Sequence, residues 1–566
     1  MTIYQVFTRL FGADKANCIP SGTKQQNGCG TMQDFTAKAL EQIKALGCTH
    51  IWYTGIIEHA SKTDYSAYGI PKDNPDVVKG EAGSPYAIRD YYDVDPDLAK
   101  DPAKRIHEFE LLVERTHKAG LKVIIDFVPN HVARQYHSDA KPCAEVRDLG
   151  EDDDRTCSFS ANNNFYYLPA EQLHLDNILP KSTYKEFPAK ATGNDNFTSR
   201  PSKNDWYETV KLNYGIDYVG GRQSHFSPTP DTWHKMLHIL LYWASKGIDG
   251  FRCDMAEMVP VEFWGWALPQ VKKAFPNIIF IAEVYNPSLY RDYIHRGHFD
   301  YLYDKVGLYD TLLDVCRGKS TQSITACWQA VDDIRGMMLN FLENHDEQRL
   351  ASDFLLADAR KALPALLVSS LMPCPFMLYF GQELGERGMD AEGFSGKDGR
   401  TTIFDYWTIP SIQRWRNKGR FDDKLLTADE LSLQKTYRSI LQLREQALYL
   451  DGGFYDLMYA NPHLQRQYAF IRHKGKKMAL IVANFSDKEE TVSLTLPQHF
   501  FDFAGIKEKA KTTMCNQLSD SKVNIPFNSS EPLVVTLPAN LGIILSQPHS
   551  PPLSEGVSTQ IVRADL

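Results

Sequence analysis

Several features that mark other classes of protein are missing from this sequence. No apolar run is long enough to span a bilayer, and no Cys-x-x-Cys pair occurs, which disfavours a zinc ribbon or a thioredoxin-like site. Positive charge is not in excess, because 62 Lys and Arg face 71 Asp and Glu and the net charge is -9 at pH 7. Such a surface favours neither nucleic acid nor an anionic membrane as a partner. We expect a globular protein that lacks both partners.

The start of the chain gives little support for export. The first ten residues have no basic segment followed by an apolar one, and they predict a strand rather than a signal peptide. A cytoplasmic location is the simplest interpretation; the alternative is the periplasm or the exterior if a signal peptide has been removed. Ten cysteines in 566 residues do not make a disulfide scaffold. Most should be reduced, although Cys143 and Cys157 share one polar stretch and could pair in an exported protein.

What the sequence does contain is a regular alternation of strand and helix patterns. Helical patterns, such as those at residues 34–46 and 103–119, separate short β-branched or aromatic runs. Repeated strand and helix predict parallel strands joined by crossover helices. With this many units in about 440 residues, a closed (β/α)8 barrel is favoured over a doubly wound open sheet. The runs lie at residues 3–7, 50–54, 122–128, 248–251, 278–284, 337–342 and 376–380.

Two breaks in this alternation predict the domain boundaries. Residues 133–230 are polar and irregular, and a loop of that length without its own structure would be unusual, so we expect a subdomain inserted after the third strand. Residues 448–550 resemble antiparallel strands with turns between them, which predicts a separate β-sandwich. The barrel would then comprise residues 1–132 and 231–447, and residues 551–566, rich in Ser and Pro, would form a mobile tail.

Four polar clusters fall at or just after predicted strand ends. They are Asp126-Phe-Val-Pro-Asn-His131, Gly250-Phe-Arg-Cys-Asp254, Ala282-Glu283-Val-Tyr285 and Asn344-His345-Asp346. In a (β/α)8 barrel the carboxyl ends of the strands converge on one mouth, where active sites form. Each cluster alone has an ordinary structural explanation, such as an Arg–Asp pair in a loop. Together they predict a site built from Asp126, His131, Arg252, Asp254, Glu283, His345 and Asp346.

The ordered set resembles the α-amylase family, glycoside hydrolase family 13. Further similarities lie in Tyr4-Gln-Val-Phe at the first strand, in Tyr379-Phe-Gly-Gln-Glu383 at the eighth, and in Ser84-Pro-Tyr86 followed by Asp90-Tyr-Tyr-Asp-Val-Asp-Pro96. The last segment is similar to the one whose tyrosine stacks under the reacting sugar, here Tyr86. Pro85 departs from the glycine that the family usually has there. The resemblance implies a hydrolase of α-glucosidic bonds in α-glucans or maltooligosaccharides.

The residue types suit retaining hydrolysis, which needs a carboxylate nucleophile and a second carboxyl that acts first as acid and then as base. Asp254 is the expected nucleophile, kept ionised by Arg252 two positions earlier on the same strand face, and Glu283 is the expected acid/base. Candidate aromatic walls for sugar rings are Tyr166, Tyr167, Trp206 and Tyr285. By the resemblance, Asp346 stabilises the transition state, Tyr86, His131 and His345 bind the sugar, and Asp126 supports Arg252.

Two other functions remain open at this point. An α-glucan transglycosylase would use the same carboxylates, since acceptor loops decide between water and sugar. A non-catalytic glucan-binding barrel is disfavoured, because retaining three convergent carboxylates is costly without function. The preference for α-1,4 or α-1,6 bonds and the oligomeric state also remain open.

No cofactor is expected to be required and no metal ligand is predicted. Many α-amylases hold a structural Ca²⁺ between the barrel and the inserted domain. By the resemblance its ligands would include Asn130, an acidic residue at the position of Lys211 and a backbone carbonyl at Met258. Ca²⁺ needs six to eight oxygen ligands, and a Lys ammonium supplies none. We therefore expect no Ca²⁺ at this place, with the ammonium bonded to the same oxygens; the alternative is that Lys211 simply points to solvent.

Overall fold

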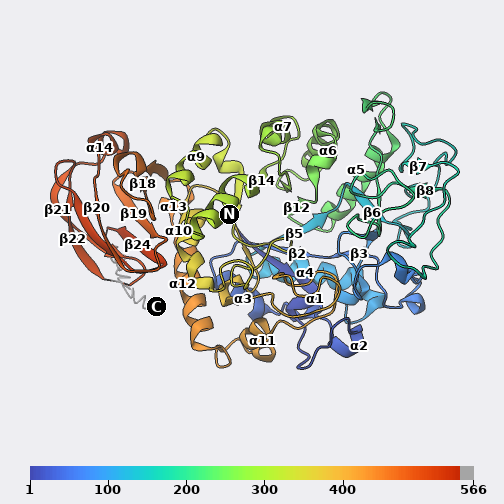
Figure 1. Cartoon of the computed structure of the whole chain (residues 1–566), viewed down its shortest axis with the longest axis horizontal. Helices are drawn as coiled ribbons and strands as arrows, with labels where there is room; N and C mark the ends of the chain where they lie inside the picture. The colour runs from blue at the N-terminus through green and yellow to red at the C-terminus, as the bar shows by residue number, and fades with distance from the viewer. Residues whose placement is uncertain (520, 548–566) are drawn as a thin grey trace, which may run out of the picture.

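The computed structural model describes residues 1–519 and 521–547. Eight parallel strands close into a barrel, as the alternation of strands and helices predicts (Figure 1). In order round the barrel they are β1 (Thr2–Phe7), β16 (Phe376–Tyr379), β15 (Met338–Phe341), β14 (Tyr301–Tyr303), β13 (Ile279–Ala282), β12 (Gly250–Cys253), β5 (Lys122–Phe127) and β2 (His50–Thr54). The strands are apolar along most of their length because the barrel buries both of their faces.

The helices that connect the strands pack around the barrel through one apolar face each. In α5 the buried residues Trp233, Met236, Leu240 and Trp243 recur at three- and four-residue intervals, which is the period of a helix face. None of the helices in the described ranges combines the length and the apolar character needed to cross a bilayer. The main helices of the barrel are α3 (Ala37–Ala45), α4 (Arg105–Lys118), α5 (Asp231–Ser245), α6 (Val261–Ala274), α7 (Tyr290–His295), α8 (Asp310–Cys316), α9 (Gln322–Ala330), α10 (Leu363–Leu371), α11 (Pro410–Arg416) and α12 (Ala428–Leu443).

One barrel strand was absent from the sequence prediction. β14 has only three residues, so it is too short to stand out as an apolar run. The fourth strand also differs, because residues 248–251 were predicted whereas β12 begins at Gly250 and ends at Cys253. Pairing explains this shift: Gly250 lies opposite Ile124 and Cys253 opposite Phe127 of β5, which carries β12 two residues farther towards the site.

The chain between β6 (His131–Ala133) and α5 contains only short strand pairs. β6 pairs with β9 (Thr209–Lys211), β7 (Tyr167–Leu168) with β8 (Ala189–Lys190), and β10 (Ile216–Asp217) with β11 (Gln223–Ser224). A small separate core joins Leu173, Leu175, Ala189 and Tyr207 of this part to Val77, which lies earlier in the chain. All ten cysteines of the described chain, including Cys143 and Cys157, are free thiols.

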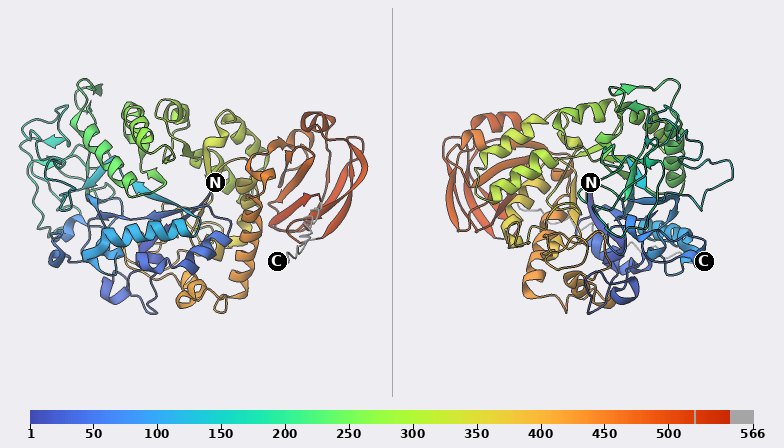
Figure 2. Two further views of the ribbon diagram at one scale, coloured as in Figure 1. Left: turned by 180° about the vertical axis from the view of Figure 1, so that it is seen from behind. Right: turned by 45° about the vertical axis from the view of Figure 1, so that its right-hand side comes forward.

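Two antiparallel sheets follow the barrel at the opposite end of the molecule from β7 and β8 (Figures 1 and 2). One has six strands in the order β17-β18-β19-β24-β21-β22 and the other pairs β20 with β23. The predicted tail, residues 551–566, lies outside the described residues, as do residues 548–550 of the predicted sandwich. The strands are β17 (Gly453–Asp456), β18 (Gln467–Lys474), β19 (Lys477–Asn484), β20 (Glu490–Leu494), β21 (Lys509–Asn516), β22 (Lys522–Phe527), β23 (Leu533–Leu537) and β24 (Leu541–Ser546).

The barrel and the larger sheet share one buried layer. All nine residues of α10 are buried, and the helix contacts β15 of the barrel as well as β19 and β24 of the sheet. Beside it the fully buried Arg472 donates hydrogen bonds to four backbone carbonyls, those of Leu371, Tyr449, Gly452 and Gly453, at 2.6–3.1 Å. Burial lowers the pKa of Arg472 to about 10. This guanidinium therefore bonds the end of α10 to the first strands of the sheet.

Replacing Arg472 with leucine should loosen this junction. The substitution fills much of the space but leaves buried carbonyl oxygens without donors, at a cost of about 1–3 kcal/mol for each one that water cannot reach. We expect a fall in Tm of several degrees and faster proteolytic cleavage in residues 446–453, both measured against R317A, which removes an exposed arginine. A Tm equal to that of R317A would contradict a structural role for Arg472.

Candidate active site

The polar residues predicted from strand ends meet at one mouth of the barrel. Asp126 belongs to β5 and Arg252 to β12, and the two lie directly opposite each other in the parallel register of these strands. Asp254 is the first residue after β12, and Glu283 is the first after β13. The position of each carboxylate is thus determined by the strand that precedes it, which places the set on rigid elements.

Arg252 is the hub of this cluster. Its side chain is fully buried, and Nη1 lies 2.7 Å from Asp254 Oδ1 and 3.4 Å from Asp126 Oδ1. Nη2 lies 2.8 Å from Glu283 Oε2. The guanidinium also lies 5.1–5.5 Å from the ring centres of Trp52, Tyr86 and Tyr303. One cation therefore contacts three carboxyl groups inside an aromatic enclosure.

Burial sets the electrostatics of the carboxyls. It raises the pKa of Asp254 well above its ordinary value, the Arg252 guanidinium opposes that shift, and the nearby carboxyls of Glu283, Asp346 and Asp126 add to it. Burial likewise raises the pKa of Asp126 to about 6, against the opposing effects of Arg252 and of a hydrogen bond from Trp52. A single cation cannot neutralise four neighbouring carboxylates, so the site favours a proton on at least one of them.

Glu283 is held by two further hydrogen bonds. Its Oε2 accepts the backbone N–H of Met255 at 2.7 Å, and its Oε1 accepts the hydroxyl of Tyr285 at 2.5 Å. Met255 has a left-handed backbone with φ of 42°, a conformation that costs a non-glycine residue about 1–2 kcal/mol. In this conformation the amide of Met255, which directly follows Asp254, points towards Glu283. The backbone at Met255 thus links the two carboxyl groups.

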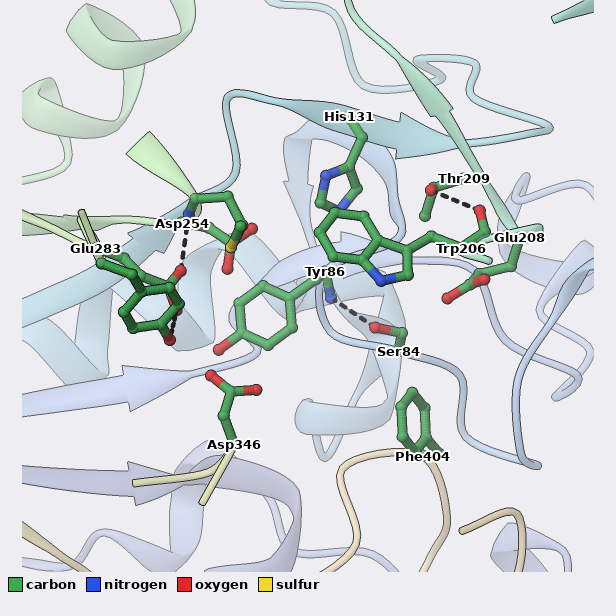
Figure 3. A pocket seen from close by; sticks show the side chains of 12 residues that line it. Ser84, Tyr86, His131, Trp206, Glu208, Thr209, Asp254, Glu283, Asp346 and Phe404 are labelled. Atoms are coloured by element: carbon green, nitrogen blue, oxygen red, sulfur yellow. Dashed lines mark hydrogen bonds between the residues drawn. The ribbon is translucent and has the colours of Figure 1, made fainter. Parts of the chain in front are cut away.

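A cavity of about 330 Å³ opens onto these groups (Figure 3). Five of the predicted site residues line it, whereas Asp126, Arg252 and His345 are not among the lining residues. In Figure 3, Glu283 and Asp254 lie on one side of Tyr86 and Asp346 on another. The predicted residues in the wall are Tyr86, His131, Asp254, Glu283 and Asp346.

The two predicted histidines are both buried and neutral. Burial lowers the pKa of His131 to about 3, and the Lys211 ammonium adds to the shift. Burial lowers the pKa of His345 well below its usual value, and the charge of Arg252 adds to it. His345 Nδ1 lies 2.8 Å from Gln5 Nε2, and its Nε2 lies 3.1 Å from Asp346 without a hydrogen-bond partner among the described residues.

The unpaired atoms point to a polar ligand. Like His345 Nε2, the buried hydroxyl of Tyr86 has no partner within the described chain. The Tyr86 ring stacks on His345, with centres 5.0 Å apart and planes 22° apart. Buried polar groups are normally hydrogen-bonded, so a ligand rich in hydroxyls would satisfy both.

The wall of the cavity contains some of the aromatic residues predicted from the sequence and several residues that the sequence does not predict. Trp206 and Tyr285 line the cavity as proposed for sugar-stacking aromatics, but Tyr166 and Tyr167 do not. Glu208 is another wall residue, and it forms a buried ion pair of 2.9 Å with Lys79. The others are Ser84, Thr209, Met255 and Phe404. Most of these lie in loops or in the inserted segment, where no periodicity marks them.

Lys211 is buried rather than directed to solvent. Its Nζ donates to Asn130 Oδ1 and, at 3.2 Å, to the carbonyl oxygen of Met258. A third contact joins it to Asp195 Oδ1 at 2.8 Å. These include the two oxygens that the family resemblance assigns to a bound cation, so the ammonium occupies the space between them.

Comparison with known proteins agrees with this geometry. The family model for the α-amylase catalytic domain matches residues 5–424. Neopullulanase 2 of Thermoactinomyces vulgaris is 22% identical over 515 residues, covering 88% of this chain and 71% of the relative. A cyclomaltodextrinase of a Bacillus species is 24% identical over 441 residues, covering 76% of this chain and 64% of the relative.

Solved structures share the fold. The crystal structure of a maltogenic α-amylase from Thermotoga neapolitana superposes with a TM-score of 0.61 at 21% identity, covering 97% of this chain and 99% of that one. The family match spans most of the barrel, including every strand end that carries a predicted site residue. The chain belongs to the α-amylase family and is an α-amylase-like glycoside hydrolase.

Proposed function

We propose that this site hydrolyses α-glucosidic bonds of α-glucans or maltooligosaccharides with retention of configuration, with Asp254 as nucleophile and Glu283 as acid/base. In the first step the ionised carboxylate of Asp254, which the Arg252 guanidinium stabilises against the opposing effect of burial, attacks the anomeric carbon while Glu283 gives its proton to the departing glycosidic oxygen. In the second step water attacks the covalent glycosyl ester and returns a proton to Glu283. The two inversions together give net retention.

The observation that carries this proposal is the shared guanidinium. Asp254 and Glu283 bind the two terminal nitrogens of Arg252 at 2.7 and 2.8 Å, which keeps their carboxyl groups adjacent in the wall of one cavity. Retaining enzymes need the shorter of the two carboxyl separations found in glycosidases, because their nucleophile attacks the anomeric carbon directly, whereas an inverting enzyme must fit a water molecule between its base and that carbon. The cluster therefore favours retention over inversion.

The remaining groups suit the sugar that would lie between these carboxyls. Asp346 and His345 Nε2 would bond its hydroxyl groups, Tyr86 would lie under the ring, and His131 would add a further polar contact. Asp126 would act only through Arg252. The relatives' names, neopullulanase and cyclomaltodextrinase, are those of α-glucan hydrolases, which supports maltooligosaccharides as substrates.

Glu283→Gln should almost abolish turnover while keeping the fold. The amide retains the shape of the side chain but has no proton to give, and general acid/base catalysis is worth about 10²–10⁴-fold. We expect kcat on maltotetraose to fall by at least 10³-fold, with oligosaccharide binding retained in calorimetry. The control is E262Q, which removes an exposed carboxylate from α6. Turnover near that of E262Q would exclude Glu283 as the acid.

The first sugar released should be the α-anomer. Proton NMR during the first minutes of maltotetraose cleavage resolves the anomeric protons before mutarotation mixes them. An initial β-anomer would rule out a covalent intermediate on Asp254. The same samples test the alternative reaction, because products longer than the substrate would show transfer to sugar instead of to water.

We also propose that Lys211 replaces the Ca²⁺ ion of related enzymes. Lys211 is 2% exposed, and its ammonium contacts oxygens of Asn130, Asp195 and the Met258 carbonyl. These three oxygens therefore already surround a cation. A divalent ion placed among the same oxygens would meet a like charge and no additional ligand. The junction between β9 and the barrel would thus be independent of metal.

EDTA should therefore leave the Tm of the wild-type protein within about one degree of its value in excess Ca²⁺, because no ion contributes binding energy there. Lys211→Asp should lower the Tm without Ca²⁺ and regain part of it when Ca²⁺ is added. Metal analysis of the purified protein provides an independent measure. A large EDTA-induced fall in Tm that is the same in both proteins would contradict the replacement.

A further inference from the structure

We propose that the hydroxyl of Tyr285 positions the catalytic proton of Glu283 and stabilises the carboxylate that remains when the proton has left. This inference rests on the acid/base role proposed above and assigns to Tyr285 a task beyond that of a wall for sugar rings. Tyr285 touches the reacting carboxyl but neither gives nor takes a proton in the balance of the reaction, so it is a positioning residue.

The surroundings of Glu283 determine which of its oxygens carries the proton. Oε2 lies 2.7 Å from the amide nitrogen of Met255 and 2.8 Å from Nη2 of Arg252. Both neighbours can only donate hydrogen bonds, so a proton on Oε2 would point at other hydrogens. The acid proton therefore belongs on Oε1.

Oε1 contacts a group that can adapt to either state of the acid. The Tyr285 hydroxyl lies 2.5 Å from it and can accept a hydrogen bond from the protonated carboxyl or donate one to the ionised carboxylate. Burial raises the pKa of Tyr285 far above its usual value, and the charge of Glu283 adds to the shift, so the hydroxyl retains its own proton. Arg252 and Met255 cannot reverse their bonds in this way.

The protein fixes the backbone that carries this hydroxyl. Glu257 Oε2 accepts the N–H groups of Tyr285 and Asn286 at 3.1 and 3.0 Å. Tyr285 also lines the active-site cavity, so its ring is within reach of a sugar bound there. A fixed hydroxyl beside Oε1 can hold the proton in line with the cavity.

The proton balance of each step follows from this arrangement. As the bond from the anomeric carbon to the glycosidic oxygen breaks, that oxygen keeps the electron pair and takes the proton from Oε1. Tyr285 then donates its O–H to the anionic Oε1, a hydrogen bond to a charged group that is stronger than one to a neutral group. In the second step Oε1 takes a proton from water as the water oxygen attacks, and Tyr285 resumes its first orientation.

Tyr285→Phe tests this role, because it removes the hydroxyl and keeps the ring. Loss of a donor to the ionised carboxylate disfavours that form, so the acid keeps its proton to higher pH. The alkaline limb of the kcat profile on maltotetraose should move up by about one pH unit, and kcat should fall about tenfold, because a hydrogen bond to a charged group has roughly this strength. KM should change little, since the stacking surface remains.

A second substrate separates proton positioning from a structural effect. Maltosyl fluoride needs no proton on its leaving group, so the burst of fluoride in a single turnover should stay within about twofold of the wild type. The control Tyr53→Phe removes a buried hydroxyl that bonds the Thr116 hydroxyl at 2.7 Å, away from the cavity, and it should leave both substrates and the pH profile unchanged.

Two results would overturn the inference, and a third would refute the proposed function on which it rests. Equal losses on maltotetraose and maltosyl fluoride, with an unshifted alkaline limb, would show that Tyr285 has only a structural role. If Y285F fails to fold, Glu257→Gln loosens the same backbone and should give a smaller shift in the same direction; no shift there overturns the proposal. A wild-type enzyme that inverts configuration, or does not cleave maltotetraose, would refute the proposed function instead.

Discussion

The site depends on the ion pairs that the buried guanidinium of Arg252 forms with its neighbouring carboxyl groups. Removing such a cation from water costs several kcal/mol, and the cost is offset only where carboxylates and hydrogen bonds surround it closely. Asp254, Glu283 and Asp126 supply these partners at 2.7–3.4 Å. The dependence is mutual, because without Arg252 each of these buried carboxyls would lose the cation that it contacts. The four side chains therefore stabilise one another, and the register of β12 on β5 places Arg252 opposite Asp126.

Around this cation the protein separates charge from neutral hydrogen-bonding groups. His131 and His345 are uncharged because burial and neighbouring cations lower their pKa values, so in the proposed role they would bond sugar hydroxyls without competing for the carboxylates. The negative charge is confined to the carboxyls, where it can stabilise an oxocarbenium-like transition state. Met255, whose backbone is in the left-handed conformation, adds a neutral hydrogen bond from its amide to Glu283.

The sequence predicted those parts of the site that follow a strand. Arg252 and Glu283 stand out because a polar residue closes an apolar run, and the convergence of strand ends then predicts their proximity. Tyr303 also accepts a hydrogen bond from Arg252, at 3.2 Å, but β14 has three residues and gives no apolar run. Glu208 and Phe404 come from segments without periodicity, so their approach to the cavity depends on tertiary packing. Tyr285 was predicted as a stacking surface, and only the distance to Oε1 reveals the use of its hydroxyl.

In the inserted segment, the proposed replacement of an ion by Lys211 would change what the stability of the cavity wall depends on. β9 carries both Lys211 and Thr209, and Thr209 lines the active-site cavity with Glu208 just before it. Lys211 ties this strand to Asn130 and to Met258, which follow β5 and β12 respectively. An ion at that place would stabilise the wall by an amount that depends on its concentration. A lysine belongs to the strand itself, so under the proposed replacement the hydrogen bonds that hold this wall would not depend on the concentration of an ion.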